Sequence, residues 1–223
     1  MYIQLNGQII YYEKAGEGSP VILVHGNGET HEIFDVLVHD LSRTHTVYAL
    51  DTRGHGLSAT PKEFHYADMA EDVSEFIRAL SLKAPVFYGF SDGGITGLLL
   101  AAKYPRILSA LIISGANLRP KDLKRKFLRA VRKNYRKTKN PLSLLMLKEP
   151  AICEKDLASI TVPTLVLAGQ KDIVKKSATK KIANGIPNAT LRILPDETHG
   201  SYVEHSRKLY PIMKDFLKQI SKE

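Results

Sequence analysis

The chain has 223 residues, 43% of them apolar, which favours one large domain with a sizeable hydrophobic core over two ordinary domains. Its single cysteine, Cys153, excludes an intrachain disulfide, and no apolar run approaches the roughly 20 residues that a membrane-spanning helix needs. The formal charge is +9, but residues 119–139 hold eleven Lys or Arg and one acid, so the rest of the chain, with 21 basic and 22 acidic residues, is nearly neutral.

The N-terminus predicts a β-hairpin. Residues Tyr2–Leu5 and 8–12 are β-rich runs that flank Asn6-Gly7, a pair suited to a type I′ turn because both central residues need a positive φ. This start lacks the basic residues and the apolar stretch of a signal peptide. Together with the lone cysteine, it leads us to expect a reducing, cytoplasmic location.

Beyond the hairpin, short apolar runs alternate with amphipathic stretches. Continuous apolar runs of this length suit strands that are buried on both faces of a sheet. We therefore predict an α/β fold, with a mostly parallel sheet, helices on both faces and the hairpin as an antiparallel edge. The predicted strands are 21–24, 47–50, 86–88, 108–114, 164–168 and 190–194, and the predicted helices are 67–80, 94–104, 177–184 and 205–220.

Residues 116–160 interrupt this alternation. We expect residues 1–115 and 161–223 to form the core, and residues 116–160 to form a small basic helical cap over the C-terminal edge of the sheet.

Within the predicted cap, an apolar residue recurs every four positions, which predicts one apolar stripe on a helix whose other faces are Lys and Arg. Asn140-Pro141 predicts the end of this helix. The stripe consists of Leu123, Phe127, Val131 and Tyr135.

The basic residues of this segment admit three interpretations. They can form a solvated helix face, attract an anionic substrate or an acidic membrane surface, or bind nucleic acid. Nucleic acid is the least favoured partner, because the only aromatic side chains among the charges, Phe127 and Tyr135, fall on the apolar stripe.

The strongest chemical motif is Gly-Phe-Ser-Asp-Gly at residues 89–93, which follows a predicted strand and precedes a predicted helix. In that context G-x-S-x-G is typical of a nucleophile elbow, a sharp turn that strains the serine backbone and lifts its hydroxyl clear of the sheet. Glycine is needed there because larger side chains would collide in the turn. We therefore predict Ser91 as a catalytic nucleophile.

A second motif, His-Gly-Asn-Gly at residues 25–28, follows the first parallel strand. Acyl transfer needs two convergent N–H donors for the oxyanion, and we predict the backbone amides of Asn27 and of Asp92, the residue after the nucleophile. We expect Gly26 and Asp92 to lie against the bound substrate. His25 is expected to orient the loop by hydrogen bonding rather than to act as a base.

Two further candidates follow the last two predicted strands, Asp172 and His199. In open α/β sheets such residues gather at the C-terminal ends of the strands. Because serine is a poor nucleophile near neutral pH, we predict that His199 takes its proton while Asp172 holds the imidazole in the useful tautomer. Asp196 is the rival acid, but its place three residues before His199 suits a role in shaping the turn.

We predict no metal and no cofactor. The chain has no H-E-x-x-H and no C-x-x-C pattern, no G-x-x-x-x-G-K phosphate loop, and no G-x-G-x-x-G after its first parallel strand.

The order of these motifs resembles the α/β-hydrolase superfamily over the whole chain: hairpin, His-Gly loop, Asp-x-Arg-Gly-x-Gly-x-Ser at 51–58, elbow, cap, Gly-x-x-Asp and terminal His. Locally, residues 89–96, 101–105 and 114–117 are similar to the biphenyl hydrolase-like (valacyclovir hydrolase) group. Enzymes of that group cleave amino-acid esters, so the resemblance implies that Asp92 would grip the α-amino group of a substrate. The other interpretation of Asp92 is a carboxylate that stabilises a helix N-terminus.

The sequence therefore predicts a serine hydrolase with an α/β-hydrolase fold, whose partner is a small-molecule ester, an aminoacyl ester being one option. The same triad also serves the hydrolysis of thioesters, lactones and carbon–carbon bonds. The alternative from another class is a protein that uses the same fold to bind a ligand without catalysis.

Overall fold

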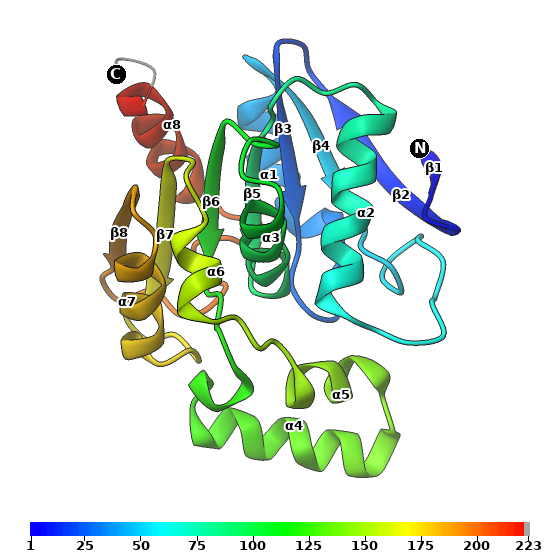
Figure 1. Cartoon of the computed structure of the whole chain (residues 1–223), viewed down its shortest axis with the longest axis vertical. Helices are drawn as coiled ribbons and strands as arrows, with labels where there is room; N and C mark the ends of the chain where they lie inside the picture. The colour runs from blue at the N-terminus through cyan, green and yellow to red at the C-terminus, as the bar shows by residue number, and fades with distance from the viewer. Residues whose placement is uncertain (221–223) are drawn as a thin grey trace.

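The computed structural model describes residues 1–220 and arranges eight strands in one sheet (Figure 1). The strands are β1 (Tyr2–Leu5), β2 (Gln8–Ala15), β3 (Ser19–Val24), β4 (His45–Leu50), β5 (Val86–Phe90), β6 (Ala110–Ser114), β7 (Thr164–Gly169) and β8 (Ala189–Leu194). Their order in the sheet is β1-β2-β4-β3-β5-β6-β7-β8. The pairs β1–β2 and β2–β4 are antiparallel and all other neighbours are parallel, which confirms the predicted α/β class.

The N-terminal hairpin forms as predicted. Asn6 and Gly7 have φ values of 50° and 73°, and Leu5 pairs with Gln8 across the turn. β2 runs further than predicted, to Ala15, because its second half pairs with β4 and so completes the antiparallel edge of the sheet.

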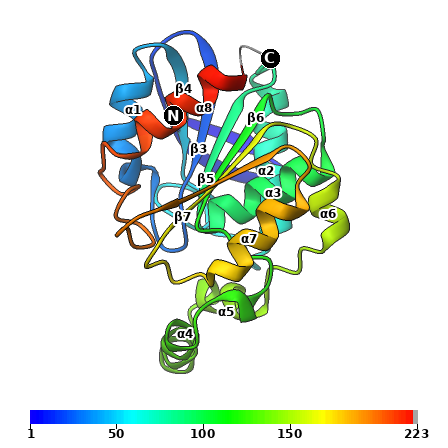
Figure 2. The ribbon, with the colours of Figure 1, turned by 90° about the vertical axis from the view of Figure 1, so that its left-hand side faces the viewer.

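Helices cover both faces of the sheet (Figures 1 and 2). α1 (Asp35–Leu41) and α8 (Leu209–Ile220) pack on one face, and α2 (Tyr66–Ala79), α3 (Asp92–Lys103), α6 (Glu154–Ala158) and α7 (Lys176–Gly185) pack on the other. The remaining helical elements are η1 (His31–Phe34), η2 (Pro120–Asp122), α4 (Arg125–Thr138) and α5 (Pro141–Lys148). Within residues 1–220, none of the helices has both the length and the apolar character that crossing a membrane requires.

Successive side chains of a strand point to opposite faces of the sheet. Because both faces are buried here, the strand sequences are continuous apolar runs. In β3, Val21 and Leu23 pack into the cluster under α1 and α8, whereas Ile22 and Val24 pack into the cluster under α2 and α3. All four are fully buried. Two cores therefore flank one sheet, and the sheet itself has no solvent-facing side at its centre.

α8 begins later than the predicted helix, which spans residues 205–220. The helix begins at Leu209, because Tyr202 and Val203 are buried in the preceding turn. His205 has a φ of 49°, and its backbone N–H donates to Ile33 O at 2.9 Å, so the chain there is fixed against η1 rather than coiled into the helix.

The segment between β6 and β7 contains η2, α4, α5 and α6, and α4 and α5 lie beyond the C-terminal ends of the parallel strands (Figure 1). α6 returns to the main core, where Leu157 is fully buried. The chain turns from α4 to α5 at Lys139, which has a left-handed φ of 54°. Asn140 then caps α5 and Pro141 occupies its first turn, so Asn140-Pro141 separates two helices instead of only ending one.

The predicted apolar stripe is wrong at its first residue. Leu123 is buried, but it precedes α4 in extended conformation, with ψ 147°. The inner face of α4 contains Leu128 and Val131, both buried, with Phe127 and Tyr135 half-buried beside them. The four-residue period of the sequence runs across the end of η2, where the helix geometry does not hold.

Candidate active site

The turn at residues 89–93 has a strained backbone. Ser91 stands between β5 and α3 with φ 53° and ψ −110°, a conformation that L-residues rarely adopt. Its N–H donates to Ser114 O at 2.7 Å, and Gly93 N–H donates to His25 O at 3.0 Å, so neighbouring strand ends hold the turn. A Cβ at Gly93 would lie 2.1 Å from Val24 O, which leaves room only for glycine.

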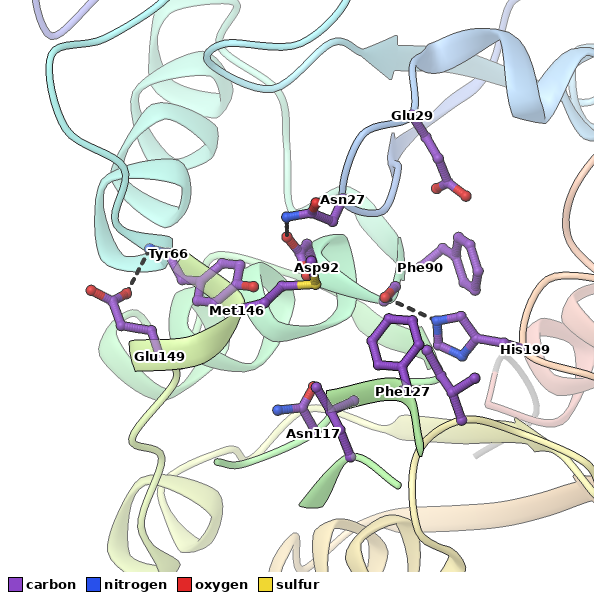
Figure 3. A pocket seen from close by; sticks show the side chains of 13 residues that line it. Asn27, Glu29, Tyr66, Phe90, Asp92, Asn117, Phe127, Met146, Glu149 and His199 are labelled. Carbon is purple, nitrogen blue, oxygen red and sulfur yellow. Dashed lines mark hydrogen bonds between the residues drawn. The ribbon is translucent and has the colours of Figure 1, made fainter. Parts of the chain in front are cut away.

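Ser91, His199 and Asp172 form one hydrogen-bonded chain. His199 Nε2 lies 3.0 Å from Ser91 Oγ (Figure 3), and its Nδ1 lies 2.7 Å from Asp172 Oδ1. Asp172 is buried, and its Oδ1 also accepts from Val174 N–H at 2.8 Å. A carboxylate at Nδ1 keeps the proton on that nitrogen, which leaves Nε2 to accept from the Ser91 hydroxyl.

The rival acid lies away from this chain of hydrogen bonds. The side chain of Asp196 is 86% exposed and pairs with Lys171 at 3.0 Å. Its φ of 58° places it in the turn between β8 and His199, in line with a role in shaping that turn.

His25 fixes the loop after β3 against the loop after β4. Thr52 N–H donates to His25 Nε2 at 3.1 Å, so Nδ1 carries the proton and donates to Gly26 O at 2.7 Å. Burial, followed by repulsion from His55, lowers the pKa of His25 to about 3. The ring is therefore neutral and serves geometry rather than proton transfer.

The two amides predicted as oxyanion donors are unengaged. Within residues 1–220, the backbone N–H groups of Asn27 and Asp92 have no hydrogen-bond acceptor. The Asp92 amide begins α3, where the helix dipole adds positive potential. The side chains of the two residues are joined, since Asn27 Nδ2 donates to Asp92 Oδ2 at 2.8 Å (Figure 3). Both backbone amides therefore remain free to donate, and their role as oxyanion donors stays a prediction.

Gly26 lies against Ser91 without lining the cavity beside it. Its N–H donates to Glu29 Oε2 at 2.7 Å, and a Cβ at this position would lie 3.0 Å from Ser91 Cβ. The absence of a side chain therefore lets the loop approach Ser91. Contact between Gly26 and a substrate stays a prediction.

A cavity of about 210 Å³ opens beside Ser91 and His199. Apart from His199, its charged lining residues are all acidic: Glu29, Asp92 and Glu149. Among residues 1–220, no group of three or more His, Cys, Asp or Glu is placed to hold a metal ion. The apolar walls consist of Phe90, Leu123, Phe127, Met146 and Ile173.

Asp92 is buried, and its carboxylate accepts from Asn27 Nδ2 and from the Tyr66 hydroxyl. Burial raises the pKa of Asp92 to about 6, against the lowering effect of those two hydrogen bonds and of His199. A cation placed next to this carboxylate would offset the cost of its burial, so the site favours a positively charged ligand group.

Glu29 and Glu149 are also held by donors. Glu29 accepts from Gly26 N–H, and burial raises its pKa to about 7. Glu149 accepts from Tyr66 N–H at 3.1 Å (Figure 3) and from His65 at 2.6 Å. The cavity therefore contains three carboxylates that are fixed in orientation.

Sequence reasoning did not single out Glu29, Tyr66 or Glu149. Glu29 directly follows the His-Gly-Asn-Gly loop at the C-terminal end of β3, and that position is a signal that could have indicated it. Tyr66 and Glu149 belong to no motif and come together over a separation of 83 residues. Only the fold brings them to the cavity.

Comparisons with known proteins agree with this architecture. A family model described as the alpha/beta hydrolase fold matches residues 19–144. The human protein "Serine hydrolase BPHL" is 28% identical, over 96% of this chain and 85% of its own length. The "AB hydrolase superfamily protein YisY" of Bacillus subtilis is 26% identical, over 93% of this chain and 94% of its own length.

Solved structures show the same fold. An esterase from Exiguobacterium antarcticum matches with a TM-score of 0.85 and 22% identity, covering 97% of this chain and 98% of that one. The enol-lactonase from Burkholderia xenovorans LB400 matches with a TM-score of 0.82 and 22% identity, covering 98% and 100%. With a family model that spans more than half of its residues, this chain belongs to the α/β-hydrolase fold family.

Proposed function

We propose that this α/β-hydrolase is a serine esterase that cleaves a small carboxylic ester through an acyl-enzyme. One observation carries the proposal: Ser91, His199 and Asp172 are linked by hydrogen bonds of 3.0 and 2.7 Å at the end of the sheet. The adjacent amides of Asn27 and Asp92 have no acceptor of their own in the described chain, which suits them to a developing oxyanion.

In the acylation step, Ser91 Oγ bonds to the ester carbonyl carbon while His199 Nε2 takes the hydroxyl proton. Asp172 stays ionised and stabilises the imidazolium. The carbonyl oxygen becomes an oxyanion that accepts from the two amides, and removal of one such donor typically costs about 10²–10³ in kcat. The bond to the alkoxy oxygen then breaks, and His199 gives its proton to the departing alcohol.

Deacylation repeats the same proton path with water. His199 takes one proton from the water, whose oxygen bonds to the acyl carbon. The bond between that carbon and Ser91 Oγ then breaks, the proton returns to Ser91, and a carboxylic acid leaves.

Residues 116–160 are proposed to form the cap of this site. Phe127 of α4 and Met146 of α5 line the cavity, and Leu142 O accepts from Asn27 Nδ2 at 3.3 Å. These contacts cover the nucleophile with apolar side chains, and exclusion of water strengthens the electrostatic interactions beneath them.

An aminoacyl ester is the substrate class that we favour. Asp92 lies in the cavity, directly after the nucleophile, and matches the acid that grips the α-amino group in the group that residues 89–96 resemble. No Lys or Arg lines the cavity to compete with a substrate ammonium. An ammonium bound there would form a charge-assisted hydrogen bond in a buried setting.

A fluorophosphonate probe tests the proposed nucleophile. We expect the probe to label the wild type covalently at Ser91, and mass spectrometry of the peptides locates the adduct. Ser91→Ala and His199→Ala should both abolish labelling, because the first removes the nucleophile and the second removes its base. Folded wild type that resists the probe would favour the alternative of a ligand-binding protein without catalysis.

A further inference from the structure

The outer face of α4 is a continuous array of positive charge. The helix contains seven Lys or Arg and no acid, and all seven are exposed. At 3.6 residues per turn they fall within an arc of roughly 140°, on the side away from buried Leu128 and Val131. This outer face consists of Arg125, Lys126, Arg129, Arg132, Lys133, Arg136 and Lys137.

The fold does not need this array. In the part of the chain that the structure describes, none of the seven side chains forms an ion pair with an acid. Like charges at i and i+4, such as Arg129 and Lys133, destabilise a helix. α4 is held instead from its inner side, where Leu128 joins an apolar cluster and Asn134 Nδ2 donates to Ser143 Oγ of α5 at 3.0 Å.

α4 is also the outermost element at its end of the molecule. It runs along the edge beyond the strand ends in Figure 1, and Figure 2 shows it end on, with no other element reaching as far. A helix of 14 residues is about 21 Å long. A flat partner could therefore touch all seven cations at once.

We propose that the outer face of α4 docks the protein on a bilayer that is rich in anionic phospholipid. Clusters of four to eight Lys or Arg on an amphipathic helix are typical of binding to acidic lipid headgroups. The large apolar side chains of α4 are buried or half-buried on its inner side, so the contact is with headgroups, without insertion. Such binding is reversible and weakens as salt screens the charges.

Nucleic acid fits this face less well. The aromatic side chains Phe127 and Tyr135 lie on the inner side of α4, so no ring is available to stack on a base. Phe127 lines the cavity from that inner side. Docking through the outer face would thus hold the cap against the lipid surface and the cavity just behind it.

Co-sedimentation with vesicles tests the proposal on the full chain. Wild type should bind vesicles of phosphatidylcholine mixed with an equal amount of phosphatidylglycerol, and should not bind phosphatidylcholine alone. Binding at about 0.05 M salt should be lost at about 0.5 M, where the Debye length is only a few ångströms. The variant Arg129→Gln/Arg132→Gln/Lys133→Gln should lose about 100-fold in partition coefficient.

A matched control removes three exposed cations from the opposite end of the sheet, before β4, β5 and β6: Arg43→Gln/Lys83→Gln/Arg106→Gln. This control has the same net charge as the α4 variant and should bind within a few-fold of wild type. Equal loss in both variants would overturn the proposal, because binding would then follow net charge alone. So would tighter binding to a duplex oligonucleotide than to the vesicles at the same salt.

The vesicle-binding result does not depend on the proposed esterase activity. None of the substituted residues lines the cavity, so turnover of a soluble p-nitrophenyl ester without vesicles should match wild type in both variants. Loss of vesicle binding with intact turnover supports docking through α4, whereas vesicle binding by a protein that turns over no ester would contradict only the esterase.

Discussion

The cavity and the outer face of α4 lie on opposite sides of one helix. They differ in the sign of their charged side chains and in whether those side chains have partners. In the cavity, Glu29, Asp92 and Glu149 are each held by hydrogen bonds from neighbouring donors. On the outer face, seven cations have no acidic partner in residues 1–220. Fixed charges orient a ligand at short range, whereas unpaired surface charges attract a partner from a distance and yield to salt.

The largest effect is expected at Asp172, the buried acid behind the cavity. Asp172→Asn keeps the shape but offers an amide to His199 Nδ1, which favours the wrong tautomer, so kcat should fall by about 10⁴. Asp196→Asn is the matched control, and it should leave kcat unchanged because its exposed side chain pairs with Lys171 at the surface. Steady-state turnover of a p-nitrophenyl ester measures both. A loss of kcat in Asp196→Asn and not in Asp172→Asn would mean that the exposed acid orients the imidazole. The burial of Asp172 would then have no part in turnover.

Next in size is the effect of Asp92 on substrate choice. Asp92→Asn keeps the size of the side chain and removes its charge, so the ratio of kcat/KM for an aminoacyl ester over its des-amino analogue should fall by about 10–100-fold. Wild type should prefer the aminoacyl ester. Equal rates for the two esters, unchanged in the variant, would leave Asp92 only the role of stabilising the start of α3.

A smaller effect is expected at Glu29, in protein stability. Burial raises the pKa of Glu29 from 4.5 to about 7, with repulsion from Glu204 in addition and with Gly26 N–H and His199 opposing. Between those pH values the folded state binds more protons than the unfolded state, so the stability conferred at acid pH is lost as the pH rises through about 7.

Glu29→Gln retains an acceptor for Gly26 N–H but cannot ionise. The variant should therefore exceed wild type in free energy of unfolding by about 1–2 kcal/mol at alkaline pH, and the two should match near pH 4. Urea denaturation across this range measures the difference. If the free energies of unfolding of the variant and the wild type differed by the same amount at acid pH, the shape of the side chain would be the cause. Glu29 would then contribute no buried charge to the difference.

The smallest effect is expected on the outer face of α4. Replacing Arg129, Arg132 and Lys133 with Gln removes several like-charge neighbours, each worth roughly 0.2–0.5 kcal/mol, so low-salt stability should rise by about 1 kcal/mol. The gain should vanish at high salt, and thermal denaturation at two salt concentrations tests both points. A less stable variant would show that the outer face supports the fold, and the contrast with the cavity would fail.

The parallel sheet was predictable from the sequence because its signal is local. Strands buried on both faces must be apolar throughout, so residues 21–24 and 164–168 stood out, and the observed strands Ser19–Val24 and Thr164–Gly169 extend them by one or two residues. The hairpin was equally clear, since Asn6-Gly7 encodes the turn itself.

Elements that depend on distant partners were not predictable. The stretch that forms η1 and α1 was not assigned a helix, because α1 has only seven residues and its helical state rests on burying Phe34, Leu37 and Leu41 against the sheet. The start of α8 was placed too early for a related reason: the turn before it is fixed by a hydrogen bond to Ile33, far away in sequence.

The candidate site also combines residues marked by a local sequence pattern with residues that only distant contacts bring to it. Ser91, Asp172 and His199 each follow a strand end within a recognisable motif, so their convergence could be expected from topology. The partners of Asp92 could not, because Tyr66 begins a helix after a long loop and no local pattern marks it. Motifs predicted the three side chains that converge, whereas the shape and charge of the cavity required the packing of the whole chain.

One consequence follows from the adjacency of β6 and β7, whose residues Ile112 and Leu165 are register partners. The chain leaves the sheet after β6 and re-enters it at β7, so residues added or removed in between leave the register of this strand pair unchanged. The length and charge of the connecting segment can therefore change while Ser91 keeps its place at the end of β5. The segment that supplies Phe127 and Met146 to the cavity can thus change without a change in the sheet.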